Sequence, residues 1–337
     1  MTDTMFDATA LERRAALGEG PLRRYERMVE IRAIEETLNG LFAAGKVHGT
    51  THLALGQEAL AVGLASRLNP DDHVTGTYRG HALALALGLT PRSLIAEILG
   101  RADGVTGGVG GSMHLSDMSI GLLPTFAIVG AGLPVAAGSA LAFQTRGESR
   151  IAVALFGDGA TNIGAFHEAL NLAAVWKLPV VFVCDNNLYG EYSRIDRTTP
   201  MEDLHVRAAS YAMPSEVVDG MDEEAVAATI GRAAERARTG GGPTFVEAKT
   251  YRFAGHSRAD TAPYRTPGEL ELWQQRDPVT LMRQSMLANG ATEAELLAVE
   301  TAIAARLAEV AAEAETLPAP DPAAMFRNIW SPKELSA

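Results

Sequence analysis

The centre of the chain contains a strand–helix–strand unit, which constrains the fold more than any other feature of the sequence. Residues 151–156 and 179–184 are apolar runs of strand length, and residues 161–177 between them repeat apolar side chains at helical spacing. A βαβ crossover makes the two strands parallel, so both carboxyl ends lie at the same edge of the sheet. Strand and helix patterns alternate along much of the remaining chain. The sequence therefore predicts an α/β fold, a doubly wound, mainly parallel sheet with helices on both faces.

A polar motif follows each of these two strands. Asp158 stands in Phe-Gly-Asp-Gly-Ala after the first strand, and Asn187 stands in Asp-Asn-Asn-Leu-Tyr after the second. At the shared edge both side chains face one crevice, beside the amino terminus of the connecting helix, which favours anions. A carboxylate, an amide oxygen and loop carbonyls suit Mg²⁺ or Ca²⁺. A single Asp after a strand is as often a turn or cap residue, but its pairing with Asn187 predicts a metal site, with a diphosphate as the remaining ligand.

The composition limits the classes of function. The 337 residues carry a net charge of −12, which argues against nucleic acid and against an anionic membrane surface as partners. The single cysteine, Cys184, lies in a predicted buried strand and is expected to pack in the core. Residues 118–145 have no charged side chain, but Pro124 and Pro134 interrupt them, so we expect a loop, a short strand and a buried helix rather than a membrane span. The first residues show no apolar signal segment, and we expect a cytoplasmic protein.

The pattern along the chain predicts one large domain with helical extensions at both ends. Residues 1–20 are polar without clear periodicity and are expected to form an arm; residues 21–315 are expected to form the domain, and residues 316–337 a tail. The Gly-rich stretch 104–117 favours neither helix nor strand. Helices are expected at residues 22–42, 56–68, 133–144, 222–239, 269–289 and 292–315, and further strands at 72–78, 215–218 and 244–249.

With its motifs, the chain resembles the α subunit of the thiamine diphosphate-dependent E1 component of 2-oxo acid and acetoin dehydrogenase complexes. The resemblance begins with the segment from Gly157 to Tyr189 and covers most of the chain, because further blocks occur in the family's order. These blocks are His-Leu-Ala-Leu-Gly-Gln-Glu-Ala at 52–59, Thr-Tyr-Arg-Gly-His at 77–81, Gly-Gly-Ser-Met-His at 110–114, Ile-Val-Gly at 128–130, and Thr-Tyr-Arg-Phe-Ala-Gly-His-Ser at 250–257.

The resemblance implies roles for particular residues. Mg²⁺ would be bound by the side-chain oxygens of Asp158 and Asn187 and by the main-chain carbonyl of Tyr189. An arginine fork and a phenol are apt donors to phosphate oxygens, as the resemblance implies for Arg79 and Tyr78. The histidines His52 and His256 would serve the active site, the latter from a loop over the cofactor. The remaining cofactor contacts would come from the backbone of Gly159 and Ala160 at the diphosphate, and of Ala127 and Val129 at the aminopyrimidine ring.

Other histidines have weaker assignments. His81 is either a further site residue or simply the start of a helix, whereas His114 and His167 are expected to be structural. The sequence also departs from the family at two points. Phe126-Ala127 stands where relatives usually have Asn-Gly, and Phe126 is expected to reshape the substrate pocket. The loop from His256 to Tyr264 is one residue shorter than in pyruvate-specific animal relatives, with Pro263 in place of a regulatory serine, which argues against control by a kinase.

The resemblance also implies partners. Thiamine diphosphate needs a carboxylate that protonates its aminopyrimidine, and in this family that glutamate belongs to a β subunit. We therefore expect an α₂β₂ heterotetramer that passes its acyl group to a lipoyl-bearing E2 acyltransferase. The substrate stays open between pyruvate, acetoin and another 2-oxo acid. The alternatives are a split-subunit thiamine-dependent lyase or transketolase-like enzyme without a lipoyl partner, and a non-catalytic regulatory subunit.

Overall fold

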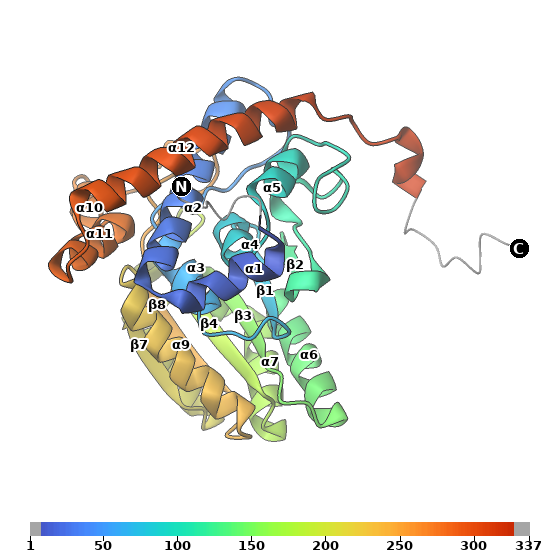
Figure 1. Cartoon of the computed structure of the whole chain (residues 1–337). Coiled ribbons are helices and arrows are strands. Elements are labelled where there is room, and N and C mark those ends of the chain that lie inside the picture. Colours follow the sequence, from blue (N-terminus) through green and yellow to red (C-terminus); the bar gives the residue numbers. More distant parts are fainter. Residues whose placement is uncertain (1–7, 327–337) are drawn as a thin grey trace, which may run out of the picture.

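The core of the molecule is a six-stranded parallel sheet with the strand order β2-β1-β3-β4-β8-β7 (Figure 1). The structure is a computed structural model that describes residues 8–326. The predicted α/β fold with a parallel sheet is confirmed. The strands are β1 His73–Thr77, β2 Leu122–Phe126, β3 Ala152–Gly157, β4 Val180–Asn186, β7 Ser215–Asp219 and β8 Thr244–Lys249, and a separate hairpin is formed by β5 Tyr189–Gly190 and β6 Ser193–Arg194.

Side chains of the central strands alternate between two hydrophobic cores. In β4, Val181 and Val183 belong to one core, while Phe182 and Cys184 belong to the other. This alternation buries both faces of the sheet, as a doubly wound fold requires. Cys184 is a buried free thiol, as predicted.

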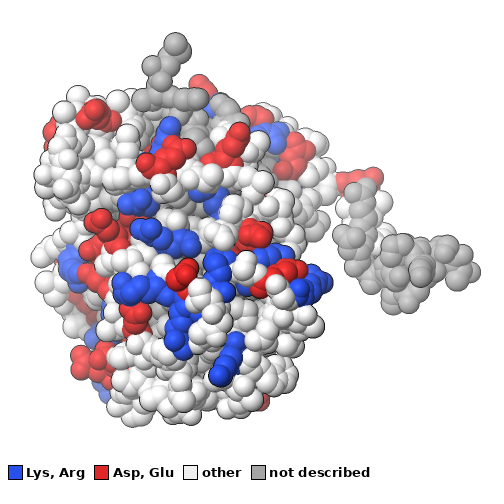
Figure 2. All heavy atoms as spheres, turned by 60° about the horizontal axis from the view of Figure 1, so that its bottom comes forward, with Lys and Arg blue, Asp and Glu red and all other residues white. Residues whose placement is uncertain are grey.

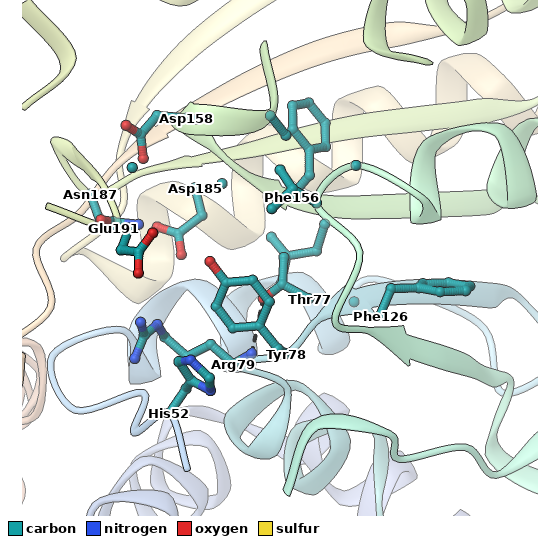
Figure 3. Close-up of a pocket in the computed structure, with 18 of the residues that line it drawn as sticks. His52, Thr77, Tyr78, Arg79, Phe126, Phe156, Asp158, Asp185, Asn187 and Glu191 are labelled. Atoms are coloured by element: carbon teal, nitrogen blue, oxygen red, sulfur yellow. Dashed lines mark hydrogen bonds between the residues drawn. The ribbon is translucent and has the colours of Figure 1, made fainter. Parts of the chain in front are cut away.

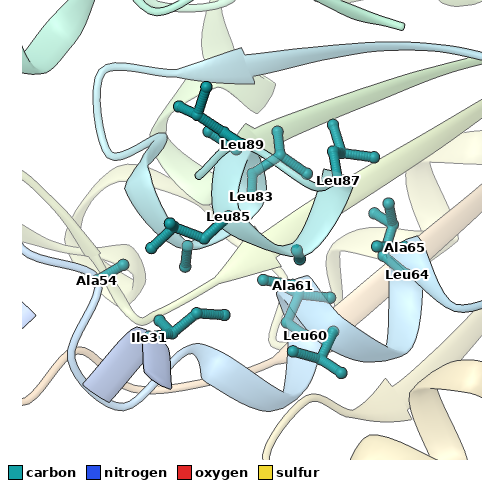
Figure 4. Packing of buried hydrophobic residues seen from close by; sticks show 14 of the residues in the cluster. Ile31, Ala54, Leu60, Ala61, Leu64, Ala65, Leu83, Leu85, Leu87 and Leu89 are labelled. Atoms are coloured by element: carbon teal, nitrogen blue, oxygen red, sulfur yellow. The ribbon is translucent and has the colours of Figure 1, made fainter. Parts of the chain in front are cut away.

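Each core is closed by its own layer of helices. Figure 4 shows how side chains of α3, among them Leu60 and Leu64, pack with Leu83 and Leu85 of α4 in the larger core. In Figure 1, α12 (red) lies across the outside of this layer. The larger core contains α2 Pro21–Ala43, α3 Glu58–Ala65, α4 His81–Leu87, α5 Pro91–Ile98, α9 Glu223–Arg238, α11 Pro278–Ala288 and α12 Glu293–Thr316; the smaller contains α6 Gly132–Arg146 and α7 Gly164–Trp176.

The strand order places a crevice at the centre of the sheet. The chain leaves β1 toward β2 on one side and then returns to form β3 on the other side of β1. Ligands of such folds bind where the order reverses, outside the carboxyl ends of the strands. The loops after β1 and β3 therefore face the position where a ligand is expected.

The amino-terminal segment differs from the expected arm. Residues 1–7 lie outside the described residues, but Ala10–Ala15 form helix α1, with a capping box between Thr9 and Glu12, and Ala16–Glu19 form a 3₁₀ turn. Arg13 is fully buried, and its Nη2 lies 2.5 Å from Oε1 of Glu30. The prediction of an arm was wrong for residues 10–19, because this helix is fixed by a buried ion pair that leaves no apolar periodicity in the sequence.

Two other helix predictions need correction, and two helices were missed. The helix expected over residues 269–289 is two helices, α10 Glu269–Gln274 and α11, because Asp277 caps a new start at Pro278. The helix expected to begin at residue 161 begins at Gly164, after a 3₁₀ turn over Asp158–Asn162. Helices α4 and α5 were not predicted.

The helices and the surface charge can be compared with the sequence-based arguments against a membrane and nucleic acid as partners. Among the described residues no helix is both long enough and apolar enough to cross a membrane. Figure 2 shows a face on which Lys and Arg side chains are interspersed with Asp and Glu, so this face is not a uniformly basic surface of the kind that binds nucleic acid.

Candidate active site

A cavity of about 480 Å³ opens at the carboxyl ends of β1, β3 and β4, where the strand order reverses. Figure 3 shows the polar side chains that converge on it from these strand ends. Every residue that the sequence assigned to a cofactor, a metal or catalysis lines this cavity. They are His52, Tyr78, Arg79, Ala127, Val129, Asp158, Gly159, Ala160, Asn187, Tyr189 and His256.

One wall presents three buried oxygen atoms without a hydrogen-bond partner. They are the two carboxylate oxygens of Asp158, which is only 1% exposed, and Oδ1 of Asn187. Burial, together with the nearby Asp185 carboxylate, raises the pKa of Asp158 to about 7. Buried acceptors without partners are costly. A hard divalent cation would satisfy all three, so this donor set fits the predicted Mg²⁺ site.

The backbone at this wall has a shape that only small residues permit. Gly159 and Gly190 face each other so closely that a Cβ atom on Gly159 would lie 3.2 Å from Cα of Gly190. Leu188 adopts a positive φ of 72°, and its N–H donates to Oδ1 of Asn186 at 3.2 Å. Tyr189 follows this turn. Its carbonyl, the third predicted metal ligand, accepts a hydrogen bond from Nη1 of Arg252 at 3.3 Å.

The facing wall carries three aromatic rings and an arginine. The His52 ring lies 4.5 Å from the Tyr78 ring and 5.0 Å from the His256 ring, centroid to centroid. Arg79 holds this group together, because Nη1 donates to the Leu53 carbonyl at 2.6 Å and Nη2 to the His256 carbonyl at 2.8 Å. The loop that carries His256 is thereby attached to the segment after β1.

Both histidines are neutral in this setting. Burial and the Arg79 charge lower the pKa of His52 to about 3 and that of His256 to about 4. Nδ1 of each ring is buried without a partner. Two neutral imidazoles with free nitrogen atoms can donate a proton to a ligand oxygen or accept one from it.

Arg252 is a site residue that the sequence analysis missed. It is 1% exposed and lines the cavity, and its Nη2 donates to the Glu191 carbonyl at 2.8 Å and to the Tyr264 hydroxyl at 2.7 Å. Burial and the Arg252 charge lower the pKa of Arg79 to about 10. A buried and a partly buried cation that repel each other favour a multiply charged anion between them. The signal was present in the Thr-Tyr-Arg block, but no spacing rule assigned it a role.

The loop from His256 to Tyr264 is fixed by Asp260. One carboxylate oxygen accepts hydrogen bonds at 2.6 Å from the His256 N–H and from the Tyr264 hydroxyl, and the other accepts from the Ala262 N–H at 2.7 Å. The backbone of His256 is therefore held both from within its own loop, at its N–H, and by Arg79, at its carbonyl.

The remaining histidines lie outside the cavity. His81 is buried as the first residue of α4, with Nδ1 3.2 Å from the Glu35 carboxylate and Nε2 2.8 Å from the Ser112 hydroxyl. Its helix-start interpretation therefore agrees with the structure. His167 on α7 bonds to the Tyr211 hydroxyl at 2.6 Å. Phe126, by contrast, lines the cavity together with Met113 and Leu155, where it can affect the shape of a substrate pocket.

Comparisons with known proteins agree with this geometry. A family model described as dehydrogenase E1 component matches residues 26–323. The alpha subunit of an acetoin:2,6-dichlorophenolindophenol oxidoreductase of Bacillus subtilis is 40% identical over 314 residues, which cover 93% of this chain and 94% of that protein. The pyruvate dehydrogenase E1 component subunit alpha of Zymomonas mobilis is 40% identical over 311 residues, 91% of this chain and 88% of that protein. A chloroplastic pyruvate dehydrogenase E1 alpha subunit of Oryza sativa is also 40% identical, over 94% of this chain and 77% of its own length.

Proposed function

Because this chain belongs to the dehydrogenase E1 component family, we propose that it is the α subunit of a thiamine diphosphate-dependent dehydrogenase. The enzyme would oxidatively cleave acetoin or a pyruvate-type 2-oxo acid and pass the acyl group to a lipoyl-bearing E2 acyltransferase. A single cofactor-binding domain over residues 21–315, a tail over residues 316–337 and a cytoplasmic location are part of the same proposal.

The observation that carries this proposal is the pairing of two unlike walls in one cavity. Three unpartnered oxygens of Asp158 and Asn187 stand on one side and the partly buried Arg79 on the other. The buried Arg252 adds a second cation, which donates to the Tyr189 and Glu191 carbonyls. A Mg²⁺ ion bridged to a diphosphate would satisfy both walls at once, which neither a lone metal nor a lone anion would do.

The residues around the cavity would divide the binding of this cofactor. Asp158, Asn187 and the Tyr189 carbonyl would hold Mg²⁺. The backbone N–H groups of Gly159 and Ala160 would meet the diphosphate, and Ala127 and Val129 would meet the aminopyrimidine ring. The donors to the far side of the diphosphate would be Tyr78, Arg79, Arg252 and His256.

When bound, thiamine diphosphate supplies a carbanion that attacks a carbonyl carbon and a ring that stores the resulting electrons. The protein would bind and orient the reacting groups and control protons near them. His52 and His256 suit this task, because each is neutral and has an unpartnered Nδ1. Arg79 would keep the two rings at their spacing through its bond to the His256 carbonyl.

The edge of the cavity supports a β subunit as partner. Ile128, in the segment proposed to meet the aminopyrimidine, is 73% exposed, and Val129 is 47% exposed. Val135, near the start of α6, is also exposed, whereas the exposed Val175 and Trp176 lie at the end of α7 away from the cavity. Such a surface is typical of a subunit interface, and it fits an α₂β₂ heterotetramer whose β subunit completes the site.

The test is activity of the chain co-expressed with its β subunit. Reduction of 2,6-dichlorophenolindophenol would be followed with thiamine diphosphate and Mg²⁺, with pyruvate, branched-chain 2-oxo acids and acetoin as substrates and Asp158→Ala as control. Turnover of one substrate that is lost in the variant is the expected result. If the tetramer binds the cofactor in calorimetry but oxidises none of these substrates, the dehydrogenase assignment is wrong and a lyase or transketolase-like reaction becomes the alternative.

A further inference from the structure

Glu191 occupies a strained position in the wall of the cavity. It is the first of two residues in the turn between β5 and β6 and adopts a positive φ of 55°. Side chains other than glycine rarely adopt this conformation, and such strain is concentrated at functional sites. Arg252 fixes the turn, since its Nη2 donates to the Glu191 carbonyl at 2.8 Å. Glycine would fit this turn without strain, so the conformation does not explain why the residue is acidic.

The turn places Glu191 between the proposed metal site and the loop that carries His256. Tyr189, whose carbonyl is a proposed metal ligand, lies two residues before it. The ring of Tyr192, the next residue, lies 6.0 Å from the His256 ring and 5.4 Å from the Tyr264 ring. Glu191 lines the cavity, and Figure 3 shows its carboxylate on the cavity side beside Asn187 and Asp185.

The charge of Glu191 has no partner within the described residues. Its carboxylate forms neither an ion pair nor a hydrogen bond there, and only its main-chain carbonyl is engaged. The other acids of the cavity differ from it. Asp158 is a proposed metal ligand, and the Asp185 carboxylate accepts hydrogen bonds from the Thr250 hydroxyl and, at 2.6 Å, from the Gln57 amide. Glu191 is exposed to solvent and therefore contributes a negative charge to the cavity that no cation of the described residues pairs with.

We propose that Glu191 selects substrates by charge, favouring a neutral acyloin such as acetoin over the anion of a 2-oxo acid. This inference rests on the proposed function. Both substrates present a carbonyl to the same cofactor, but a 2-oxo acid also brings a carboxylate into the cavity that the exposed side chain of Glu191 lines. Repulsion between the two carboxylates acts on one substrate only, and because Glu191 is exposed this repulsion is modest and is screened by salt. An unpaired charge that repels the wrong substrate is an economical source of specificity.

The experiment compares variants of the α₂β₂ heterotetramer loaded with thiamine diphosphate and Mg²⁺. Glu191→Gln keeps the size and the backbone conformation but removes the charge, and Glu191→Asp keeps the charge. Glu202→Gln, at an exposed residue outside the cavity, changes the net charge by the same amount. The ratio of kcat/KM for pyruvate to kcat/KM for acetoin is measured at low and at high salt.

Glu191→Gln is expected to raise the pyruvate-to-acetoin ratio about two- to fivefold, which corresponds to about 0.5–1 kcal/mol, mainly through a lower KM for pyruvate. The gain should shrink as salt screens the charge. Glu191→Asp and Glu202→Gln should keep the wild-type ratio. An unchanged ratio in Glu191→Gln overturns the inference, and so does a loss of affinity for Mg²⁺ without a change in the ratio, which would place Glu191 in the metal site instead.

Calorimetry separates this inference from the proposed function. The loaded heterotetramer is titrated with methyl acetylphosphonate, a singly charged analogue of pyruvate that cannot be decarboxylated. Tighter binding to Glu191→Gln than to the wild type is expected, whether or not either substrate is turned over. Equal binding overturns the role of Glu191, whereas absence of turnover in the wild type overturns only the proposed reaction.

Discussion

Replacement of Asp158 by asparagine is expected to stabilise the cofactor-free enzyme while it abolishes cofactor binding. The wild-type carboxylate is 1% exposed, both of its oxygens lack a hydrogen-bond partner, and the Asp185 carboxylate lies close enough to raise its pKa. Its burial is therefore compensated only when a cation is bound. Asparagine has nearly the same shape but no charge, so it removes the cost of burying one.

The expected magnitude follows from these contacts. An uncompensated buried charge costs about 3–5 kcal/mol, of which asparagine recovers the larger part because its amide carries no charge. We therefore expect the cofactor-free heterotetramer of Asp158→Asn to be more stable by about 2–4 kcal/mol at pH 8. The wild type alone should gain stability on addition of Mg²⁺ and thiamine diphosphate, because the ligands bind the folded state.

The assay is chemical denaturation of both proteins with and without Mg²⁺ and thiamine diphosphate, combined with calorimetric titration of the cofactor. Asp71→Asn makes the same chemical change at a side chain that is 63% exposed and should alter stability by less than about 0.5 kcal/mol. Two results would refute the reasoning. One is a cofactor-free Asp158→Asn enzyme less stable than the wild type, and the other is a variant that still binds Mg²⁺ and the cofactor with wild-type affinity.

Three further predictions concern single residues. The pKa of His256 falls from 6.5 to about 4 on folding, so between these values the unfolded chain binds a proton that the folded chain does not. The stability of the folded state should therefore decline as the pH falls from 6.5 toward 4. His256→Gln should reduce this decline in a pH series of unfolding midpoints, and an unchanged slope would contradict the prediction. Gly159→Ala places a Cβ 3.2 Å from Cα of Gly190 and should weaken cofactor binding in calorimetry about tenfold, or about 1.4 kcal/mol. In the control Gly40→Ala the new Cβ meets no atom within 4 Å, and binding should not change. Equal affinities of the two variants would show that the close approach of Gly159 and Gly190 is unimportant. Glu30→Gln leaves buried arginines without their carboxylate and should cost about 3–5 kcal/mol in urea denaturation without changing the KM for substrate, while a loss below about 1 kcal/mol would mean that the ion pair does not fix the amino-terminal helix.

The parts of the fold that could be predicted are those with a local signal in the sequence, either a helical repeat of apolar residues or a short apolar run. Residues 151–156 and 179–184 alternate their side chains between two cores, and an apolar run bounded by turn residues is visible in the sequence alone. Helix α4 was not predicted, because all its side chains are buried and the contrast between an apolar and a polar face is lost. Helix α5 has such a contrast, a cap at Thr90 and Pro91 at its first position, so its sequence signal was present and was missed. The break between α10 and α11 depended on one cap, at Asp277.

The candidate site divides in the same way. The convergence of Asp158 and Asn187 follows from the rule that parallel strands end at one edge, and this made it accessible from spacing. Arg252 and Glu191 could not be assigned in advance, since their positions depend on a hairpin and a loop that meet across the cavity. The neutral state of His52 also has no sequence signal, because it results from burial and from an arginine supplied by another segment.

The sequence by itself determined the doubly wound sheet and the residues at its crevice, because strand periodicity and the handedness of crossovers act over short stretches of chain. The tertiary structure alone decided which charges are compensated. Burial of Arg13 beside Glu30, the orphaned oxygens of Asp158 and the unpaired carboxylate of Glu191 each depend on which distant segments pack together. Electrostatic energies depend on distance and on exclusion of water, and neither can be read from positions along a chain.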